Sequence, residues 1–118
     1  MFQIGVEQCK PGAKFSKIGQ AIYDHAFECG YNIVPEFTGH GIGYYFHGPP
    51  DIYHVPNYYS GRMKPGMTFT IEPILAEGNP KMVILEDGWT ALTCDNGRAA
   101  QCEHTVLITD NGVELLTI

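Results

Sequence analysis

Apolar residues recur at helical spacing only in the first quarter of the chain. A helix over residues 2–9 has one apolar face and ends at Lys10-Pro11-Gly12. A second helix is predicted from Ser16, as its N-cap, to Cys29, with Gly30 as its C-terminal stop. Its apolar stripe consists of Ile18, Ile22, Ala26 and Cys29. This stripe requires a partner surface.

After the second helix, short β-branched and aromatic runs alternate with Gly, Pro and Asn, a pattern typical of strands and turns. Residues 67–72 alternate apolar and polar side chains and predict a strand that Pro73 ends, with Glu72 on the polar face. Residues 47–65 contain several turn-forming pairs and are predicted to form a long exposed loop.

Asn-Gly pairs mark two turns near the end of the sequence. The first separates residues 89–94 from residues 99–109, and the second separates the latter from 113–118. Three consecutive antiparallel strands are the simplest arrangement, so the fold class is α+β. The last strand is expected to be a domain end. The first helix has no beginning, so we expect the N-terminus to lie inside a longer domain.

The composition fits one globular domain, or a piece of one, over residues 1–118: 44% of the residues are hydrophobic and 17% are charged. A formal net charge of −6 without a basic cluster argues against nucleic acid as a partner. No apolar run approaches the about 20 residues of a membrane span, and no targeting segment is evident. The cysteines lack CxxC spacing and are interpreted as reduced core residues of an intracellular protein: Cys9, Cys29, Cys94 and Cys102.

The most unusual local pattern is Gly39-His40-Gly41-Ile42-Gly43, because glycine inside a strand marks a close backbone or ligand approach. Glu72 and Glu103 both lie in predicted strands, where an unpaired carboxylate costs several kcal/mol in desolvation. The nearby basic residues lie in predicted loops, so a metal ion is the economical partner. One His and two Glu suit divalent Zn, Mn, Fe or Co. The alternatives are a core histidine and edge-strand carboxylates that face water.

Three further residues are candidates for substrate contacts. His47 follows His40 by seven residues and could donate a hydrogen bond to a developing oxyanion, or else be a solvated loop histidine. Phe46 and Trp89 could line an apolar pocket or belong to the core. The remaining histidines have weaker functional signals, and a structural role is the simplest interpretation: His25, His54 and His104.

Five motifs, in this order and spacing, resemble the C-terminal half of type I methionine aminopeptidases, most of all the bacterial-like and mitochondrial branch. The motifs are Gly39-His40-Gly41-Ile42-Gly43, Phe46-His47, Phe69-Thr70-Ile71-Glu72-Pro73, Asp87-Gly88-Trp89-Thr90-Ala91 and Gln101-Cys102-Glu103-His104-Thr105. The resemblance implies the C-terminal half of a pita-bread fold, in which two α/β halves surround a curved antiparallel sheet with covering helices.

The resemblance also implies roles for individual residues at a site with two divalent metal ions (Co, Mn, Fe or Zn). The metal ligands would be His40, Glu72 and Glu103, with Glu103 bridging both ions and Glu72 handling the proton of the attacking hydroxide. His47 would contact the substrate carbonyl and stabilise the gem-diolate, and Phe46 and Trp89 would wall the methionine pocket. Two aspartate ligands belong to the family's N-terminal half, and no aspartate of this chain can replace them.

The expected function by resemblance is removal of the initiator methionine from nascent peptides, with this chain alone inactive or nearly so. A different class of function is a non-catalytic half-domain that binds a partner or self-associates through an uncovered sheet edge. A prolidase-like peptidase fits the last two motifs less well. The expected compartment is the cytoplasm, or the mitochondrion if a longer parent carries a transit peptide.

Overall fold

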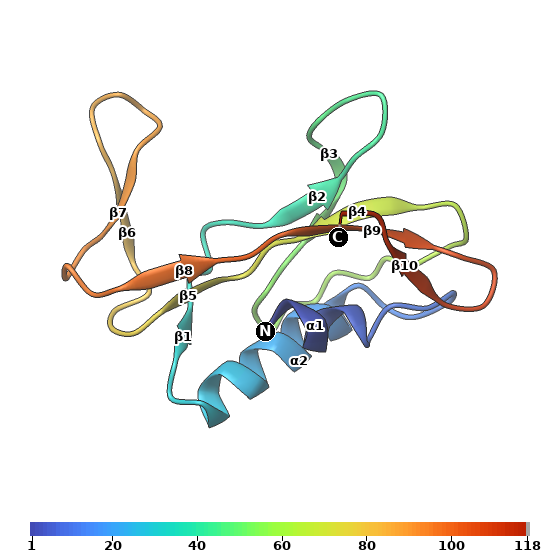
Figure 1. Cartoon of the computed structure of the whole chain (residues 1–118), viewed down its shortest axis with the longest axis horizontal. Helices are drawn as coiled ribbons and strands as arrows, with labels where there is room; N and C mark the ends of the chain where they lie inside the picture. Colours follow the sequence, from blue (N-terminus) through green and yellow to red (C-terminus); the bar gives the residue numbers. More distant parts are fainter. Residues whose placement is uncertain (118) are drawn as a thin grey trace.

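A computed structural model describes residues 1–117 and consists of two helices followed by short strands, which confirms the α+β prediction. The helices are α1 (Phe2–Val6) and α2 (Ser16–Glu28). The strands are β1 (Asn32–Ile33), β2 (Gly39–Gly41), β3 (Gly48–Ile52), β4 (Thr68–Ile71), β5 (Ile74–Ala76), β6 (Met82–Ile84), β7 (Ala91–Thr93), β8 (Ala99–Gln101), β9 (His104–Ile108) and β10 (Val113–Leu115). In Figure 1 both helices lie on one side of an elongated sheet, and two loops project from the other side.

The core lies between α2 and a five-stranded antiparallel sheet with the order β10-β9-β4-β2-β3. Phe69 of β4 and the predicted helix stripe residues Ile18 and Ile22 are fully buried, each worth about 1.5–3 kcal/mol of apolar burial. Gly19 lets α2 approach the chain closely, because a Cβ there would collide with backbone carbonyls of residues 53–55. The apolar stripe of α2 therefore packs as its spacing predicts.

A second sheet, with the order β1-β5-β8, continues the first one along the chain. The pairing of β4 with β9 ends at Ile71, which is opposite His104. The pairing of β5 with β8 begins at Ile74, which is opposite Gln101. Pro73 contributes to this break because proline has no N–H to donate to a ladder. Both candidate glutamates, Glu72 and Glu103, fall in the interruption.

The prediction of a long exposed loop over residues 47–65 is wrong in part. The segment contains β3, which pairs with β2 so that Gly39 is opposite Ile52. Ile52, His54 and Met63 are almost fully buried. Turn-forming pairs dominate this sequence, but its apolar residues sit between them and reach the core, which a count of turn signals does not detect.

The predicted hairpin between residues 89–94 and 99–109 is also wrong. Strand β7 pairs with β6, whereas β8 pairs with β5. The Asn-Gly turn does form, with φ +57° at Asn96. The Asp95 side chain, however, accepts a hydrogen bond from the backbone N–H of Asn79 at 2.7 Å, which holds the turn against the preceding segment. The second Asn-Gly turn joins β9 and β10 as predicted.

The four cysteines are free thiols, and only Cys9 is buried; Cys29, Cys94 and Cys102 are exposed, so the core interpretation is wrong for those three. Helix α1 is shorter than predicted. The prediction of Ser16 as the N-cap of α2 is wrong, because Ser16 is the first residue of the helix and Phe15 is the N-cap, without a side-chain hydrogen bond. Within residues 1–117, neither helix combines the length and hydropathy that a membrane span needs.

Candidate metal centre

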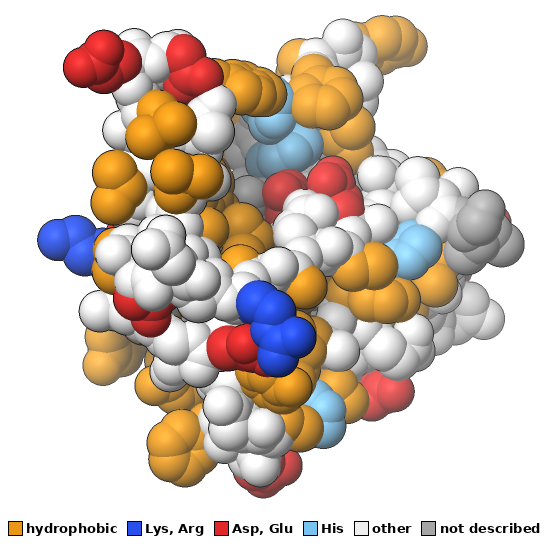
Figure 2. Space-filling model, turned by 60° about the vertical axis from the view of Figure 1, so that its left-hand side comes forward, with side chains coloured by type: hydrophobic (Ala, Val, Ile, Leu, Met, Phe, Trp, Pro, Cys, Tyr) orange, Lys and Arg blue, Asp and Glu red, His pale blue; other side chains and the backbone are white. Residues whose placement is uncertain are grey.

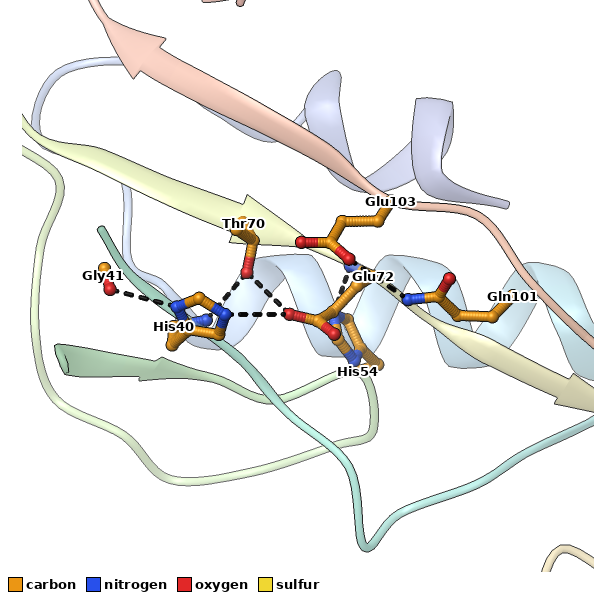
Figure 3. A network of polar contacts seen from close by, with 7 residues as sticks. All are labelled: His40, Gly41, His54, Thr70, Glu72, Gln101 and Glu103. Carbon is orange, nitrogen blue, oxygen red and sulfur yellow. Dashed lines mark hydrogen bonds and ion pairs between the residues drawn. The ribbon is translucent and has the colours of Figure 1, made fainter. Parts of the chain in front are cut away.

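The three predicted ligands converge from different strands, as Figure 3 shows. One potential ligand atom from each of His40, Glu72 and Glu103 lies within 4.8 Å of the other two. His40 is the middle residue of β2, and the two glutamates occupy the interruption between the two sheets. A site whose members are 32 and 31 residues apart is therefore assembled by strand pairing.

The two glycines beside His40 make room for neighbouring backbone. A Cβ at Gly39 would collide with the carbonyl oxygen of Thr70, and a Cβ at Gly41 would collide with that of Pro49. The His40 ring is oriented by its own strand, because Nδ1 lies 3.1 Å from the carbonyl oxygen of Gly41. A carbonyl can only accept, so Nδ1 carries the proton and Nε2 is free to act as a metal ligand.

Glu72 is held from both sides. The Thr70 hydroxyl donates to Glu72 Oε1 at 2.8 Å and accepts the backbone N–H of His40 at 3.0 Å. The same Oε1 lies 3.4 Å from His40 Nε2. Burial raises the pKa of the Glu72 carboxyl and the nearby Glu103 carboxylate adds to this, while the Thr70 hydrogen bond and the two histidines His40 and His47 oppose it.

The geometry fits a divalent ion. Two ligands about 2.1 Å from a tetrahedral ion are about 3.4 Å apart, and His40 Nε2 and Glu72 Oε1 are separated by 3.4 Å. The candidate ligand atoms of all three residues lie within 4.8 Å of one another. One imidazole nitrogen and two carboxylates form a donor set suited to Zn, Mn, Fe or Co.

Glu103 differs from Glu72 in its surroundings. It is exposed, and its only hydrogen bond among residues 1–117 is a long one of 3.5 Å from the Gln101 side-chain amide. The prediction that a strand carboxylate must be desolvated therefore holds for Glu72 and is wrong for Glu103 in this chain. The predicted placement in a strand is wrong for both glutamates, because Glu72 lies between β4 and β5 and Glu103 lies between β8 and β9.

Phe46 and His47 lie beside the metal group, in the loop between β2 and β3. The His47 ring centroid is 4.3 Å from that of His40 and 4.4 Å from that of Phe46. Both side chains are exposed. Figure 2 shows a hollow on this face, with histidine and acidic side chains inside it and hydrophobic side chains on the two projections that flank it.

Trp89 is not part of this group. It lies in the turn between β6 and β7, and its side chain is 88% exposed. The turn is fixed by Asp87, whose carboxylate accepts the backbone N–H groups of Trp89 and Thr90 at 2.9 and 2.8 Å. The β6–β7 hairpin is one of the two projections seen in Figure 1.

Two residues near the metal group were not predicted from the sequence to take part in the site. Thr70 links His40 to Glu72, and only its place on the same strand face as Glu72 hints at this. His54 is 2% exposed, and its Nε2 accepts the backbone N–H of Glu72 at 3.1 Å. Burial lowers the pKa of His54 to about 4, so the ring is neutral near pH 7. Its position in a turn-rich segment concealed this contact.

A sequence profile of metallopeptidase family M24 matches residues 1–110. The chain belongs to metallopeptidase family M24. Within this family it is similar to methionine aminopeptidases, including the chloroplastic enzyme 1B of Arabidopsis thaliana (54% identity over 96% of the chain and 31% of the relative). The mitochondrial enzyme 1D of Homo sapiens is 50% identical over 95% of the chain and 33% of the relative. The chain thus spans about a third of these M24 relatives.

Solved M24 structures agree with the profile. The methionine aminopeptidase of Rickettsia prowazekii superposes with a TM-score of 0.95 at 40% identity, over 99% of this chain and 48% of that one. The prolidase of Pyrococcus furiosus has a TM-score of 0.71 at 28% identity, over 98% of this chain and 29% of that one. The predicted pita-bread fold class is thereby confirmed, with this chain covering only part of each structure, and the methionine aminopeptidase matches better than the prolidase.

Proposed function

We propose that this chain carries the C-terminal part of the active site of a methionine aminopeptidase, which hydrolyses the bond after an N-terminal methionine. The observation that supports this most strongly is the convergence of His40, Glu72 and Glu103 to within 4.8 Å. The proposal concerns three ligands of a site for two divalent ions, with two aspartates expected from a segment that this chain does not contain.

The chain's own residues have distinct tasks in this proposal. Bound divalent ions would supply Lewis-acid chemistry, which lowers the pKa of water and polarises a carbonyl. Glu72, with its raised pKa, is suited to hold and return a proton at its carboxylate. His47 would donate a hydrogen bond to the substrate carbonyl oxygen. Phe46 and Trp89 would line the pocket for the methionine side chain.

The exposure of the site argues that the chain alone turns over slowly or not at all. Phe46 is 68% exposed and Trp89 is 88% exposed, so neither forms an enclosed pocket. A site open to water also weakens each electrostatic contact. We propose the cytoplasm or the mitochondrion as its compartment; the likeness to the mitochondrial enzyme of Mus musculus supports the mitochondrion only.

A second candidate is a non-catalytic half-domain that binds a partner or a second copy. It is favoured by the edge strand β8, whose three residues are all exposed. Two grooves adjoin this strand, with volumes of about 440 and 280 Å³. Tyr31, which lines the larger groove, is exposed, and so are apolar side chains of the β6–β7 hairpin and its turn: Val83, Ile84, Leu85 and Leu92.

Elemental analysis of the purified chain, together with methionine release from a Met-Ala peptide, tests these alternatives. The methionine aminopeptidase proposal expects metal binding that Glu72→Gln and Glu103→Gln abolish, with little or no turnover. Absence of metal above the level of these variants would refute it. A monodisperse monomer in sedimentation velocity would count against the self-association alternative.

A further inference from the structure

His54 lies in a segment between strands but is buried and contacts the backbone of Glu72. It lies two residues beyond β3, is 2% exposed, and is 18 residues from Glu72 in sequence. Its Nε2 lies 3.1 Å from the backbone nitrogen of Glu72. A backbone N–H can only donate, so Nε2 is the unprotonated acceptor and the proton resides on Nδ1. Figure 3 shows His54 behind the carboxylate group.

The end of β2 explains why Glu72 needs this acceptor. The Thr68 carbonyl accepts the N–H of Ile42 on the β2 side of β4, and every second residue of a strand directs its backbone groups to the same edge. The N–H of Glu72 therefore also faces the β2 side, where β2 itself begins only at Gly39. A buried N–H without an acceptor costs about 1–3 kcal/mol. His54 supplies that acceptor from the segment that follows β3, the edge strand on the far side of β2.

We infer that His54 is a positioning residue of the metal centre: its neutral imidazole fixes the backbone of Glu72 and thereby aims the Glu72 carboxylate at His40 and Glu103. His54 does not itself contact a metal or a substrate. The inference rests on the proposed function in one respect, namely that a divalent ion binds at these three residues. Removal of a residue that hydrogen-bonds to a metal ligand typically lowers metal affinity by about 10–100-fold.

The contact constrains Glu72 at its backbone, whereas Thr70 constrains it at its carboxylate. The two restraints together leave the side chain little freedom about χ1, because both ends are fixed. Glu103 has no comparable restraint among residues 1–117 beyond the long contact from Gln101. The order of the metal group therefore depends on Glu72, which is held by hydrogen bonds to His54 and Thr70.

The test uses the full 118-residue chain and Co²⁺ as the probe. His54→Leu has a similar volume but no acceptor, whereas His54→Gln retains an acceptor oxygen. His25→Leu, on α2 and outside the metal group, is the matched control. Co²⁺ affinity by calorimetry and the visible spectrum of bound Co²⁺ are compared with urea unfolding of the same samples.

We expect His54→Leu to weaken Co²⁺ binding about tenfold or more and to alter the Co²⁺ spectrum, with His54→Gln and His25→Leu within about threefold of wild type. Equal Co²⁺ affinity in wild type and His54→Leu, whatever their stabilities, would overturn the inference. So would equal weakening by Leu and Gln, because the acceptor would then be irrelevant.

A second measurement keeps the inference testable if His54→Leu does not fold. In the folded wild-type chain without metal, the Glu72 amide should be protected from hydrogen exchange; exchange at the rate of an exposed amide would overturn the inference. If wild type binds no more Co²⁺ than Glu72→Gln, the proposed function fails and the inference fails with it. If wild type binds Co²⁺ and His54→Leu binds it equally, only the role of His54 fails.

Discussion

Replacement of Thr70 by valine tests whether the hydrogen-bond chain around Glu72 stabilises the fold. Valine matches the shape of threonine but lacks the hydroxyl, so the mutation removes two hydrogen bonds, of 2.8 Å to Glu72 and 3.0 Å from the His40 N–H. Thr70 is 1% exposed, so water cannot replace the hydroxyl. Leaving one buried donor unsatisfied costs about 1–3 kcal/mol, and we expect a loss of about 2 kcal/mol.

Thr70→Ser is the matched control, because it retains the hydroxyl and loses one buried methyl group worth about 0.8 kcal/mol. Urea unfolding followed by far-UV circular dichroism is the suitable assay. Fluorescence of the single tryptophan is not, because Trp89 is 88% exposed in the folded chain. With a slope of about 1–2 kcal/mol per molar urea, the Thr70→Val midpoint should fall by about 1–2 M.

The metal readout gives the same mutation a second, independent test. The Thr70 hydrogen bond lowers the pKa of Glu72, so its removal should raise that pKa further and weaken Mn²⁺ binding at pH 6 more than at pH 8. A Thr70→Val chain that unfolds at the wild-type urea concentration would refute the energetic argument. An unchanged Mn²⁺ affinity at both pH values would refute the electrostatic one.

Three further predictions follow from the same geometry. Gly41→Ala should destabilise the chain by more than about 2 kcal/mol in urea unfolding, because its Cβ would collide with the Pro49 carbonyl. Gly43→Ala, which meets nothing within 4 Å, should be within about 0.5 kcal/mol of wild type, and equal losses would contradict the packing argument. Burial raises the pKa of the Cys9 thiol to about 12, so a disulfide reagent should label three thiols of the folded chain quickly and the fourth only in urea. The raised pKa of Glu72 means that the folded chain holds this proton more tightly than the unfolded chain, so its ionisation lowers stability as pH rises above about 4.5. Without metal, Glu72→Gln should therefore melt at a higher temperature than wild type at pH 7 and at a similar temperature at pH 4; a lower melting temperature at pH 7 would contradict this.

Local sequence signals predicted the elements whose contacts are themselves local. The helical stripe of α2 and the strand that ends before Pro73 are examples, because each depends on periodicity and on the chemistry of one breaker. The pairing of β7 with β6 was missed; it is accompanied by a hydrogen bond from the Asn79 N–H to the Asp95 carboxylate, a contact between residues 16 positions apart. A contact of this kind leaves no periodic trace in sequence.

The residues of the candidate site could likewise be predicted from the sequence only in part. His40, Glu72 and Glu103 were recognised because glycine and carboxylate stand out in apolar strands, and the structure brings them together. His54 was missed because its importance comes from Ile52 and its neighbours reaching the core, not from its own surroundings in sequence. Residues that act through a neighbour's backbone leave the weakest signal.

The two glutamates of the metal group differ in how well they are ordered before a metal ion binds. Glu72 is already ordered and partly desolvated, so it contributes a preformed ligand with His40 at tetrahedral spacing. Glu103 is exposed at the junction beside the edge strand β8 and must pay its ordering entropy when metal binds. The entropic cost of binding a metal ion at this group therefore falls mainly on Glu103.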